Sequence, residues 1–285
     1  MKLGAHMSIA GGYNRALDRG KEVDCTAVQL FTKNANQWAG KPITEEDVER
    51  FRTTSQTVGY DLDALMAHDS YLINLATPND ELWQKSLDAF GHELDRCAML
   101  GIPALVTHAG AHMGSGEDAG LARIAQGLDT VLSERKGQDV TVLLETTAGQ
   151  GTCLGYTFEH IARVIDLLDD DHKARVGVCW DTCHLFVAGI DFTDKDKYER
   201  MVESFDKVIG LEKLRGIHLN DSKKGLGSRV DRHEHIGQGA LGVEPFRFIL
   251  NDYRLANIPK VIETPKGEDL AEDRVNLDLL RSLVS

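Results

Sequence analysis

The chain has 285 residues, 42% of them apolar, and a formal net charge of −13. This length fits one large α/β domain or two ordinary domains, and such a chain can bury a core without disulfide staples. The composition excludes a disordered chain, and the acidity argues against nucleic-acid binding through overall charge, because that binding is mostly cationic.

The N-terminus and the cysteines indicate the compartment. The opening residues MKLGAHMS lack the apolar core and cleavage pattern of a signal peptide, and no apolar run approaches membrane-spanning length. The five cysteines are dispersed and odd in number, which is typical of reduced thiols. We therefore expect a cytoplasmic protein without a membrane partner.

Eight short apolar or β-branched runs recur along the chain and predict strands. In chain order they cover residues 3–7, 27–31, 62–67, 104–107, 140–144, 176–180, 214–219 and 261–262. Longer stretches with helical spacing of apolar residues fill the intervals between these runs.

The expected helices lie near residues 13–20, 44–58, 82–97, 121–131, 157–168, 198–209, 243–251 and 277–283. Thr44 with Asp47 three residues later predicts an N-terminal cap, and Thr157 predicts another. Gly101 is placed to end the third helix.

Eight strand–helix units predict a (β/α)8 TIM barrel, formed by a single domain over residues 1–285. A doubly wound open sheet also alternates strands and helices, and it is the alternative fold. The segment after the first strand, in GAHMSIAGG, lacks the GxGxxG fingerprint of such dinucleotide-binding sheets.

Ligand-type side chains lie at or just after the ends of six successive predicted strands. The set comprises His68, His108, Glu145, Asp181, His184, His218, Asp231, His233 and Glu263. In a barrel all of them lie at the C-terminal mouth, where the active sites of this fold are found. The set is too large for one zinc ion and suits two or three metals with a bridging carboxylate.

Each of these residues alone also has a structural interpretation. A single histidine after a strand is more often hydrogen-bonded than metal-bound, and Asp181 could cap a helix that contains His184. Asp231 and His233 could belong to an ordinary polar loop. The metal interpretation depends on the recurrence, because an unrelated arrangement would scatter such residues over both ends of a barrel.

The stretch from residue 218 to 239, HLNDSKKGLGSRVDRHEHIGQG, adds cations to this rim. Lysines and arginines among glycines are typical of phosphate binding. A loop that carries both metal-type and phosphate-type side chains predicts a metal-assisted site for a phosphorylated substrate.

Eight motifs spread over residues 3–265 resemble the endonuclease IV family of apurinic/apyrimidinic endonucleases. In chain order they are GAHMSIAGG, QLFTKNANQW, HDSYLINLA, THAGAH, LLETTAGQGTCLG, DTCHLFVAGID, the 218–239 stretch and VIETP. The resemblance covers nearly the whole chain and implies a zinc-dependent hydrolase, a phosphodiesterase that acts on DNA.

The resemblance implies three zinc ions per chain, with manganese able to replace zinc in part. The ligand-type residues then divide into three groups, one for each ion: His68, His108 and Glu145; Glu145, Asp181, His218 and Glu263; and His184, Asp231 and His233. Glu145 would bridge two ions and is the expected catalytic residue.

The implied reaction is cleavage of the phosphodiester bond 5′ to an abasic site in duplex DNA, during base excision repair. The two bridged ions would activate a shared water, and the third would stabilise the departing 3′ oxygen. The products would be a 3′-hydroxyl and a 5′-deoxyribose phosphate. Damaged double-stranded DNA is the implied partner, and the chain would act as a monomer.

The resemblance also implies DNA contacts. Tyr71 and Leu72 match side chains that wedge into the bent duplex beside a flipped nucleotide, although they also fit a packed turn. Asn36 occupies a third wedge position that usually carries arginine, which predicts weaker binding or a changed salt dependence. The expected phosphate contacts are Lys33, Lys223, Lys224, Arg229 and Arg232.

Two other functions stay open. A metal-dependent sugar isomerase or epimerase can share the barrel and a one- or two-metal rim, but it has no evident use for His184, Asp231 and His233. A barrel that binds damaged DNA without cleaving it would need no intact ligand set. Cleavage of an abasic duplex, tested beside a ketose panel, discriminates among the three.

Overall fold

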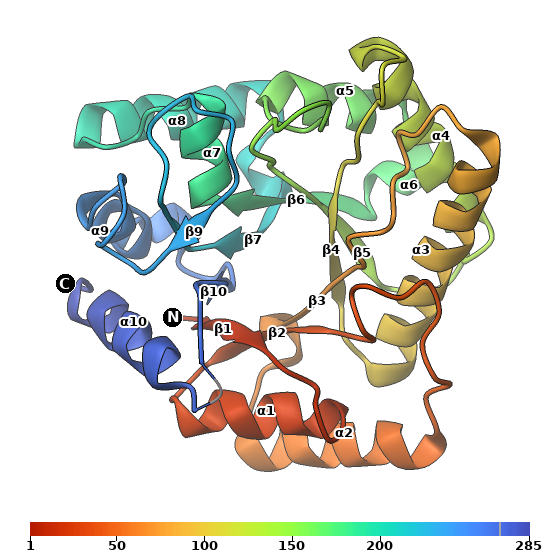
Figure 1. Cartoon of the computed structure of the whole chain (residues 1–285). Coiled ribbons are helices and arrows are strands. Elements are labelled where there is room, and N and C mark those ends of the chain that lie inside the picture. The colour runs from red at the N-terminus through yellow and green to blue at the C-terminus, as the bar shows by residue number, and fades with distance from the viewer. Residues whose placement is uncertain (268) are drawn as a thin grey trace.

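The computed structural model describes residues 1–267 and 269–285. Eight parallel strands close into a barrel, and helices surround it (Figure 1). Neighbouring strands follow the order β1-β10-β7-β6-β5-β4-β3-β2, and β2 pairs with β1 to close the ring. The predicted barrel is therefore confirmed, and the open sheet is excluded.

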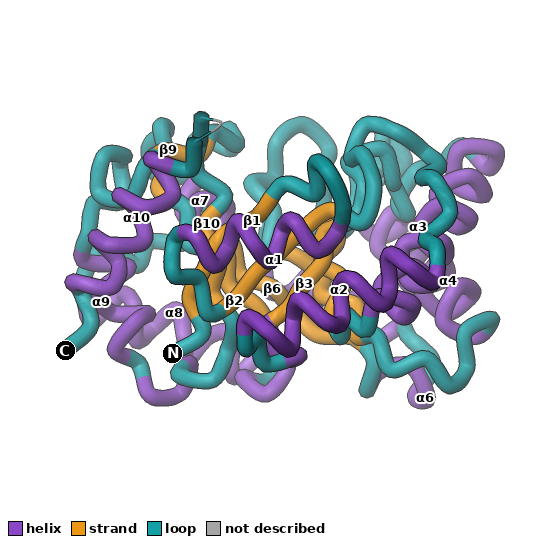
Figure 2. The backbone as a smooth tube through the Cα atoms, turned by 90° about the horizontal axis from the view of Figure 1, so that it is seen from below, coloured by secondary structure: helices purple, strands orange, loops and turns teal. Residues whose placement is uncertain are grey.

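The barrel strands are β1 (Leu3–Met7), β2 (Ala27–Phe31), β3 (Leu65–His68), β4 (Ala104–His108), β5 (Thr141–Glu145), β6 (Val176–Asp181), β7 (Leu214–His218) and β10 (Lys260–Ile262). After β7 the chain forms a small antiparallel ribbon of β8 (Asp221–Ser222) and β9 (His233–Glu234). In Figure 2 the strands lie at the centre, the helices lie outside them, and β9 lies at the upper edge.

The helices are α1 (Tyr13–Glu22), α2 (Glu45–Val58), α3 (Asp80–Leu100), α4 (Glu117–Ser133), α5 (Phe158–Leu167), α6 (Asp170–Lys173), α7 (Thr182–Ala188), α8 (Lys195–Val208), α9 (Glu244–Asn251) and α10 (Ala271–Ser282). None of the described helices is both long enough and apolar enough to cross a lipid bilayer.

Local sequence signals explain where several helices begin and end. Thr44 and Asp47 form a reciprocal capping box before α2, Thr157 caps α5, and Gly101 adopts the left-handed conformation after α3. The short helix α6 was not expected, whereas α7 is the helix that a cap at Asp181 would begin. The third strand was expected from residue 62, but it begins at Leu65 because residues 62–64 form a 3₁₀ turn.

Two apolar clusters build the core. The larger one lies mainly between the strands and the helices. The smaller one takes single residues from several strands, including Ala27, Met66, Val106, Leu143 and Cys179. Because side chains alternate along a strand, these residues face the barrel interior, and the residue two positions later in each strand faces it as well.

Candidate metal centre

The interior-facing register of the strands positions the candidate ligands. His68 follows Met66 by two residues, His108 follows Val106, Glu145 follows Leu143, and Asp181 follows Cys179. Each candidate ligand therefore points into the barrel above an apolar floor, at the C-terminal end of its strand. Val261 belongs to the same cluster, and a side chain at Gly216 would meet Met66, Leu143 and Cys179, so His218 and Glu263 have the same two-residue spacing from interior positions.

The structure brings all nine predicted ligand-type residues together. They form three groups, and within each group the ligand atoms lie within 4.8 Å of one another: His68, His108 and Glu145; Glu145, Asp181, His218 and Glu263; and His184, Asp231 and His233. These are the three groups that the sequence resemblance implies, with Glu145 shared by two of them.

Glu145 lies at the centre of the site, and its two oxygens face different histidines. Oε2 lies 3.0 Å from Nε2 of His68 and 3.3 Å from Nε2 of His108. Oε1 lies 3.1 Å from Nδ1 of His184 and 3.2 Å from Nδ1 of His218. Burial would raise the pKa of Glu145, but the neighbouring imidazoles of His218 and His108 hold it well below its usual range. An ionised carboxylate with one oxygen for each side is suited to bridge two cations.

Asp181 is placed to serve both as a helix cap and as a metal ligand, the two roles that the sequence left open. Its Oδ1 accepts a hydrogen bond of 2.8 Å from the backbone N–H of His184 and so caps α7. Its Oδ2 faces Nε2 of His233 at 3.6 Å and Nδ1 of His218 at 3.8 Å. One carboxylate oxygen therefore starts the helix, while the other remains available to the second group.

The third group depends on a loop. Asp231 lies between β8 and β9, with Oδ2 3.1 Å from Nε2 of His184 and Oδ1 3.4 Å from Nε2 of His233. Burial would raise the pKa of Asp231, but the His184 imidazole lowers it to about 2. The backbone N–H of Asp231 donates to Oε1 of Gln150, which anchors the loop to the segment after β5.

Unsatisfied nitrogens in the third group fit a bound cation. Nε2 of His184 and Nε2 of His233 are buried and form no hydrogen bond with any described residue. Leaving buried polar atoms unpaired is costly, so such atoms call for a partner other than a protein side chain. An ion coordinated by the two nitrogens and Asp231 would satisfy both, and nitrogen with oxygen is a donor set that zinc accepts.

Backbone carbonyls orient three of the imidazoles. Nδ1 of His68 lies 3.0 Å from the carbonyl of Asp69, and Nδ1 of His184 lies 2.9 Å from that of Thr146. Nδ1 of His233 lies 3.2 Å from the carbonyl of Glu263. A carbonyl accepts and cannot donate, so Nδ1 carries the proton and Nε2 is free to bind a metal.

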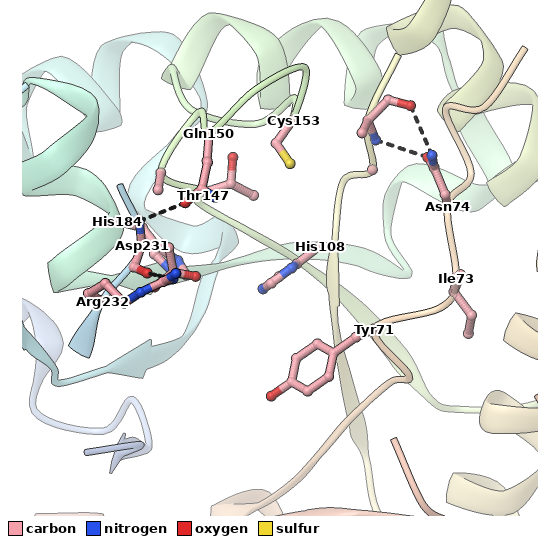
Figure 3. A pocket seen from close by; sticks show the side chains of 13 residues that line it. Tyr71, Ile73, Asn74, His108, Thr147, Gln150, Cys153, His184, Asp231 and Arg232 are labelled. Carbon is pink, nitrogen blue, oxygen red and sulfur yellow. Dashed lines mark hydrogen bonds and ion pairs between the residues drawn. The ribbon is translucent and has the colours of Figure 1, made fainter. Parts of the chain in front are cut away.

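A cavity of about 360 Å³ opens beside the ligands. Figure 3 shows His108 pointing toward His184 and Asp231, with the ring of Tyr71 below it on the same side of the cavity. Tyr71 is 61% exposed, and its ring contacts those of Phe31 and His108 with centroid separations of 5.5 and 6.3 Å. An exposed aromatic side chain at the edge of this cavity can reach a ligand.

All the other expected DNA contacts except Lys33 are at least partly exposed. Leu72 is half-buried, and Asn36 is exposed in the loop after β2. Arg229 and Arg232 are exposed on the loop that carries Asp231, and the guanidinium of Arg229 lies 4.5 Å from the ring centroid of Tyr156. Lys223 and Lys224 are exposed on the same loop.

Lys33 corrects the sequence expectation. Its ammonium group lies 2.8 Å from Oε1 of Glu93, and the two side chains are 3% and 1% exposed. It also donates to the carbonyl of Gln37 at 2.8 Å. Lys33 therefore ties the loop after β2 to α3 and does not reach DNA phosphate from this position.

Sequence reasoning missed two buried amides beside the ligands. Nδ2 of Asn220 donates to Oδ2 of Asp181 at 2.7 Å, and its Oδ1 accepts from the backbone N–H of Glu263 at 2.7 Å. Gln29 contacts His218 and Glu263. A polar residue inside an apolar run, as in AVQLF, was the available signal for Gln29, because a buried amide needs partners.

Comparisons with known proteins identify the relatives of the chain. Residues 17–283 match the family described as xylose isomerase-like TIM barrel. A protein named probable endonuclease 4 from Chloroflexus aurantiacus is 54% identical over 283 residues, which are 99% of this chain and 98% of that protein.

Solved structures agree with the sequence relatives. The crystal structure of endonuclease IV from Thermus thermophilus matches with a TM-score of 0.86 and 32% identity, and the match covers 99% of this chain and 98% of that one. A D-tagatose 3-epimerase-like protein has a TM-score of 0.74 at 15% identity, with 99% and 97% coverage, and it shows a shared fold alone.

Proposed function

The chain belongs to the endonuclease IV family of the xylose isomerase-like TIM barrels, and we propose that it cleaves duplex DNA 5′ to abasic sites. The family makes the protein a nuclease, and therefore a hydrolase. The proposal extends this to the lesion, to the bond that breaks and to the products, a 3′-hydroxyl and a 5′-deoxyribose phosphate.

One observation carries the proposal. Three groups of histidine and carboxylate ligands lie at the mouth of the barrel, and Glu145 is shared by two of them. A one- or two-metal sugar isomerase would leave the group of His184, Asp231 and His233 without a role. A phosphodiester substrate gives a third cation a role, because charge develops on the leaving oxygen as well as on the attacked phosphate.

The residues present fit three divalent ions, and we propose zinc, with manganese able to replace it in part. His68 and His108 would hold the first ion, His218 and Glu263 would help to hold the second, and Glu145 would join both. Ions bound in this way would supply Lewis-acid activation of water and of phosphate oxygens.

The chain itself would position the substrate. Tyr71 lies at the edge of the cavity and half-buried Leu72 follows it in the chain, and either side chain could insert between the bases beside an abasic nucleotide. Arg229 and Arg232 would hold backbone phosphates from the loop that also supplies Asp231. We place this reaction in base excision repair and propose that one chain acts alone.

The decisive experiment is cleavage of an end-labelled duplex with one central abasic site, before and after treatment with a chelator. We expect a nick 5′ to the site with a 3′-hydroxyl end, lost on chelation and regained with zinc. Glu145→Gln should lower the cleavage rate by at least about 100-fold, more than the usual effect of a residue behind a metal ligand. Glu203→Gln, on α8, is the matched control.

Cleavage that survives complete removal of metal would refute the metal mechanism. A chain that leaves the abasic duplex intact but converts a ketose would instead be an isomerase. Tight binding to the abasic duplex without scission, in protein loaded with zinc, would show a damage-binding protein.

A further inference from the structure

Gln29 is a buried amide in the middle of β2 that contacts the metal centre from the side where no ligand was predicted. It has 0% exposure, and its side chain reaches three others across the barrel interior. Nε2 lies 2.7 Å from Oε1 of Glu263 and 3.0 Å from Nδ1 of His6, while Oε1 lies 2.8 Å from Nε2 of His218.

Strands β1 and β2 complete the interior-facing pattern described for the other strands. His6 follows Gly4 by two residues, Gln29 follows Ala27 by two residues, and His6 and Gln29 are neighbours in the pairing of β1 with β2. All eight barrel strands thus contribute a polar side chain to the mouth. In β1 and β2 this side chain precedes the last residue of the strand.

The hydrogen bonds fix the orientation of the amide. The carboxylate of Glu263 can accept but not donate, so the Gln29 nitrogen must face Oε1 of Glu263. The amide oxygen then faces His218 and can only accept, so Nε2 of His218 carries a proton. The second N–H of Gln29 points at Nδ1 of His6, which leaves the amide fully hydrogen-bonded.

This orientation determines which nitrogen His218 can offer. In the neutral imidazole, a proton on Nε2 leaves the lone pair of Nδ1 facing the other members of the second group. Nδ1 lies 3.1 Å from Oε2 of Glu263 and 3.2 Å from Oε1 of Glu145. His68, His184 and His233 have the reverse arrangement, because backbone carbonyls hold their Nδ1 atoms.

We propose that Gln29 is the positioning residue of the second metal site, setting the tautomer of His218 and the orientation of Glu263. The inference rests on the proposed metal centre. Among the described residues, His218 is the candidate ligand whose remaining ring nitrogen is held by a side-chain amide, so a single substitution outside the ligand set can release it. Residues of this kind set ligand orientation and metal affinity although they do not touch the metal.

The test is the zinc content of purified Gln29→Met, measured by elemental mass spectrometry across a series of zinc buffers. Methionine has a similar length but neither donates nor accepts a strong hydrogen bond. We expect one ion per chain to leave at a free zinc concentration about 10–100-fold higher than in the wild type, while the other two stay. Gln138→Met is the matched control, because Gln138 bonds to Asp95 outside the site.

Two outcomes would overturn the inference. Release of all ions at the wild-type concentration would show that Gln29 does not affect metal binding. Joint release of all three, together with a lower unfolding midpoint in metal-free protein, would show a general structural role.

A measurement on the wild type does not depend on how the variant folds. In zinc-loaded protein with ¹⁵N-labelled histidine, we expect His218 to be protonated at Nε2, and His68, His184 and His233 at Nδ1. The His218 signal is assigned by its loss in His218→Asn. A proton on Nδ1 of His218 would refute the proposal.

Neither measurement uses DNA. A wild type with three ions and an unaffected Gln29→Met would refute the role of Gln29 alone. A wild type that binds no metal would refute the proposed function.

Discussion

Lys260 is a charged residue that the fold buries at the start of β10. It is 1% exposed, and its ammonium group donates to the carbonyls of Leu255 and Ile258 at 2.6 and 2.9 Å. No carboxylate among the described residues forms an ion pair with it. Burial lowers its pKa to about 8, and the charge of Lys2 acts in the same direction while Asp252 opposes it.

This lowered pKa predicts how stability changes with pH. In the unfolded chain the lysine keeps its proton up to a pH of about 10.4, so between pH 8 and that value the unfolded state binds more protons. The free energy of unfolding should therefore rise with pH in this window, by about 1.4 kcal/mol per pH unit.

The comparison is urea unfolding of the wild type and Lys260→Met at pH 7.5, 8.5 and 9.5, without metal. Subtracting the unfolding free energy of the variant from that of the wild type cancels the contributions of the cysteines and tyrosines, which titrate in both proteins. The difference in unfolding free energy should shift in favour of the wild type as pH rises. A difference that stays constant would show that Lys260 titrates normally in the fold.

At the same scale, Asp181 shows why a structural and a functional interpretation need not compete. The sequence places it at a strand end, where it can be a cap or a ligand. In the structure Oδ1 caps α7 while Oδ2 faces two histidines. The cap orients the carboxylate, and this orientation presents the second oxygen to the centre of the barrel.

Among the elements, the barrel strands could be predicted from sequence because their apolar runs are local. The candidate ligands of β3 to β7 and β10 followed, because they lie at the strand end or directly after it. Gln29 did not, since in β2 the interior-facing position precedes the end of the strand. The alternation of side chains, counted from the apolar floor, would have located it.

The loop between β2 and α2 shows what the sequence could not provide. Lys33 lies in a polar stretch, and nothing local distinguishes it from a surface lysine. Its partner, Glu93, is about sixty residues away on α3, and Glu93 also accepts a hydrogen bond from the Thr32 hydroxyl. Arg96 adds hydrogen bonds to the hydroxyl and the carbonyl of Thr32.

The buried pair makes Lys33 important for stability. Lys33→Met leaves the charge of Glu93 buried without its cation, so we expect a loss of about 3–5 kcal/mol in the free energy of unfolding. Lys33→Met with Glu93→Leu should regain most of that loss, because neither charge is then buried. Urea unfolding of the two single variants and the double variant measures the coupling.

If Lys33 contacted DNA directly, the opposite results would be expected. Lys33→Met would then unfold like the wild type and would reduce the salt dependence of DNA binding. That pattern would contradict the role of Lys33 as an anchor of the loop.

At the scale of the whole molecule, the charges are unevenly distributed. The chain carries a net charge of −13, yet the exposed loop between β8 and β9 contains Lys223, Lys224, Arg229 and Arg232. Bound divalent ions would add further positive charge beside this loop. An acidic molecule can therefore present a cationic mouth to a polyanion, and local charge governs the contact.

This separation predicts that DNA binding depends on where a charge lies. Arg229→Gln and Arg232→Gln each remove one candidate phosphate contact, so each should make the negative slope of log K against log salt shallower by about 0.9. Arg215→Gln makes the same change in net charge at an exposed site in β7, before the interior-facing Gly216, and should leave the slope unchanged. Binding is measured by fluorescence anisotropy with an abasic duplex, in the Glu145→Gln background to prevent cleavage. If Arg215→Gln makes the slope as shallow as the loop variants do, binding follows net charge, and the loop between β8 and β9 does not provide the phosphate contacts.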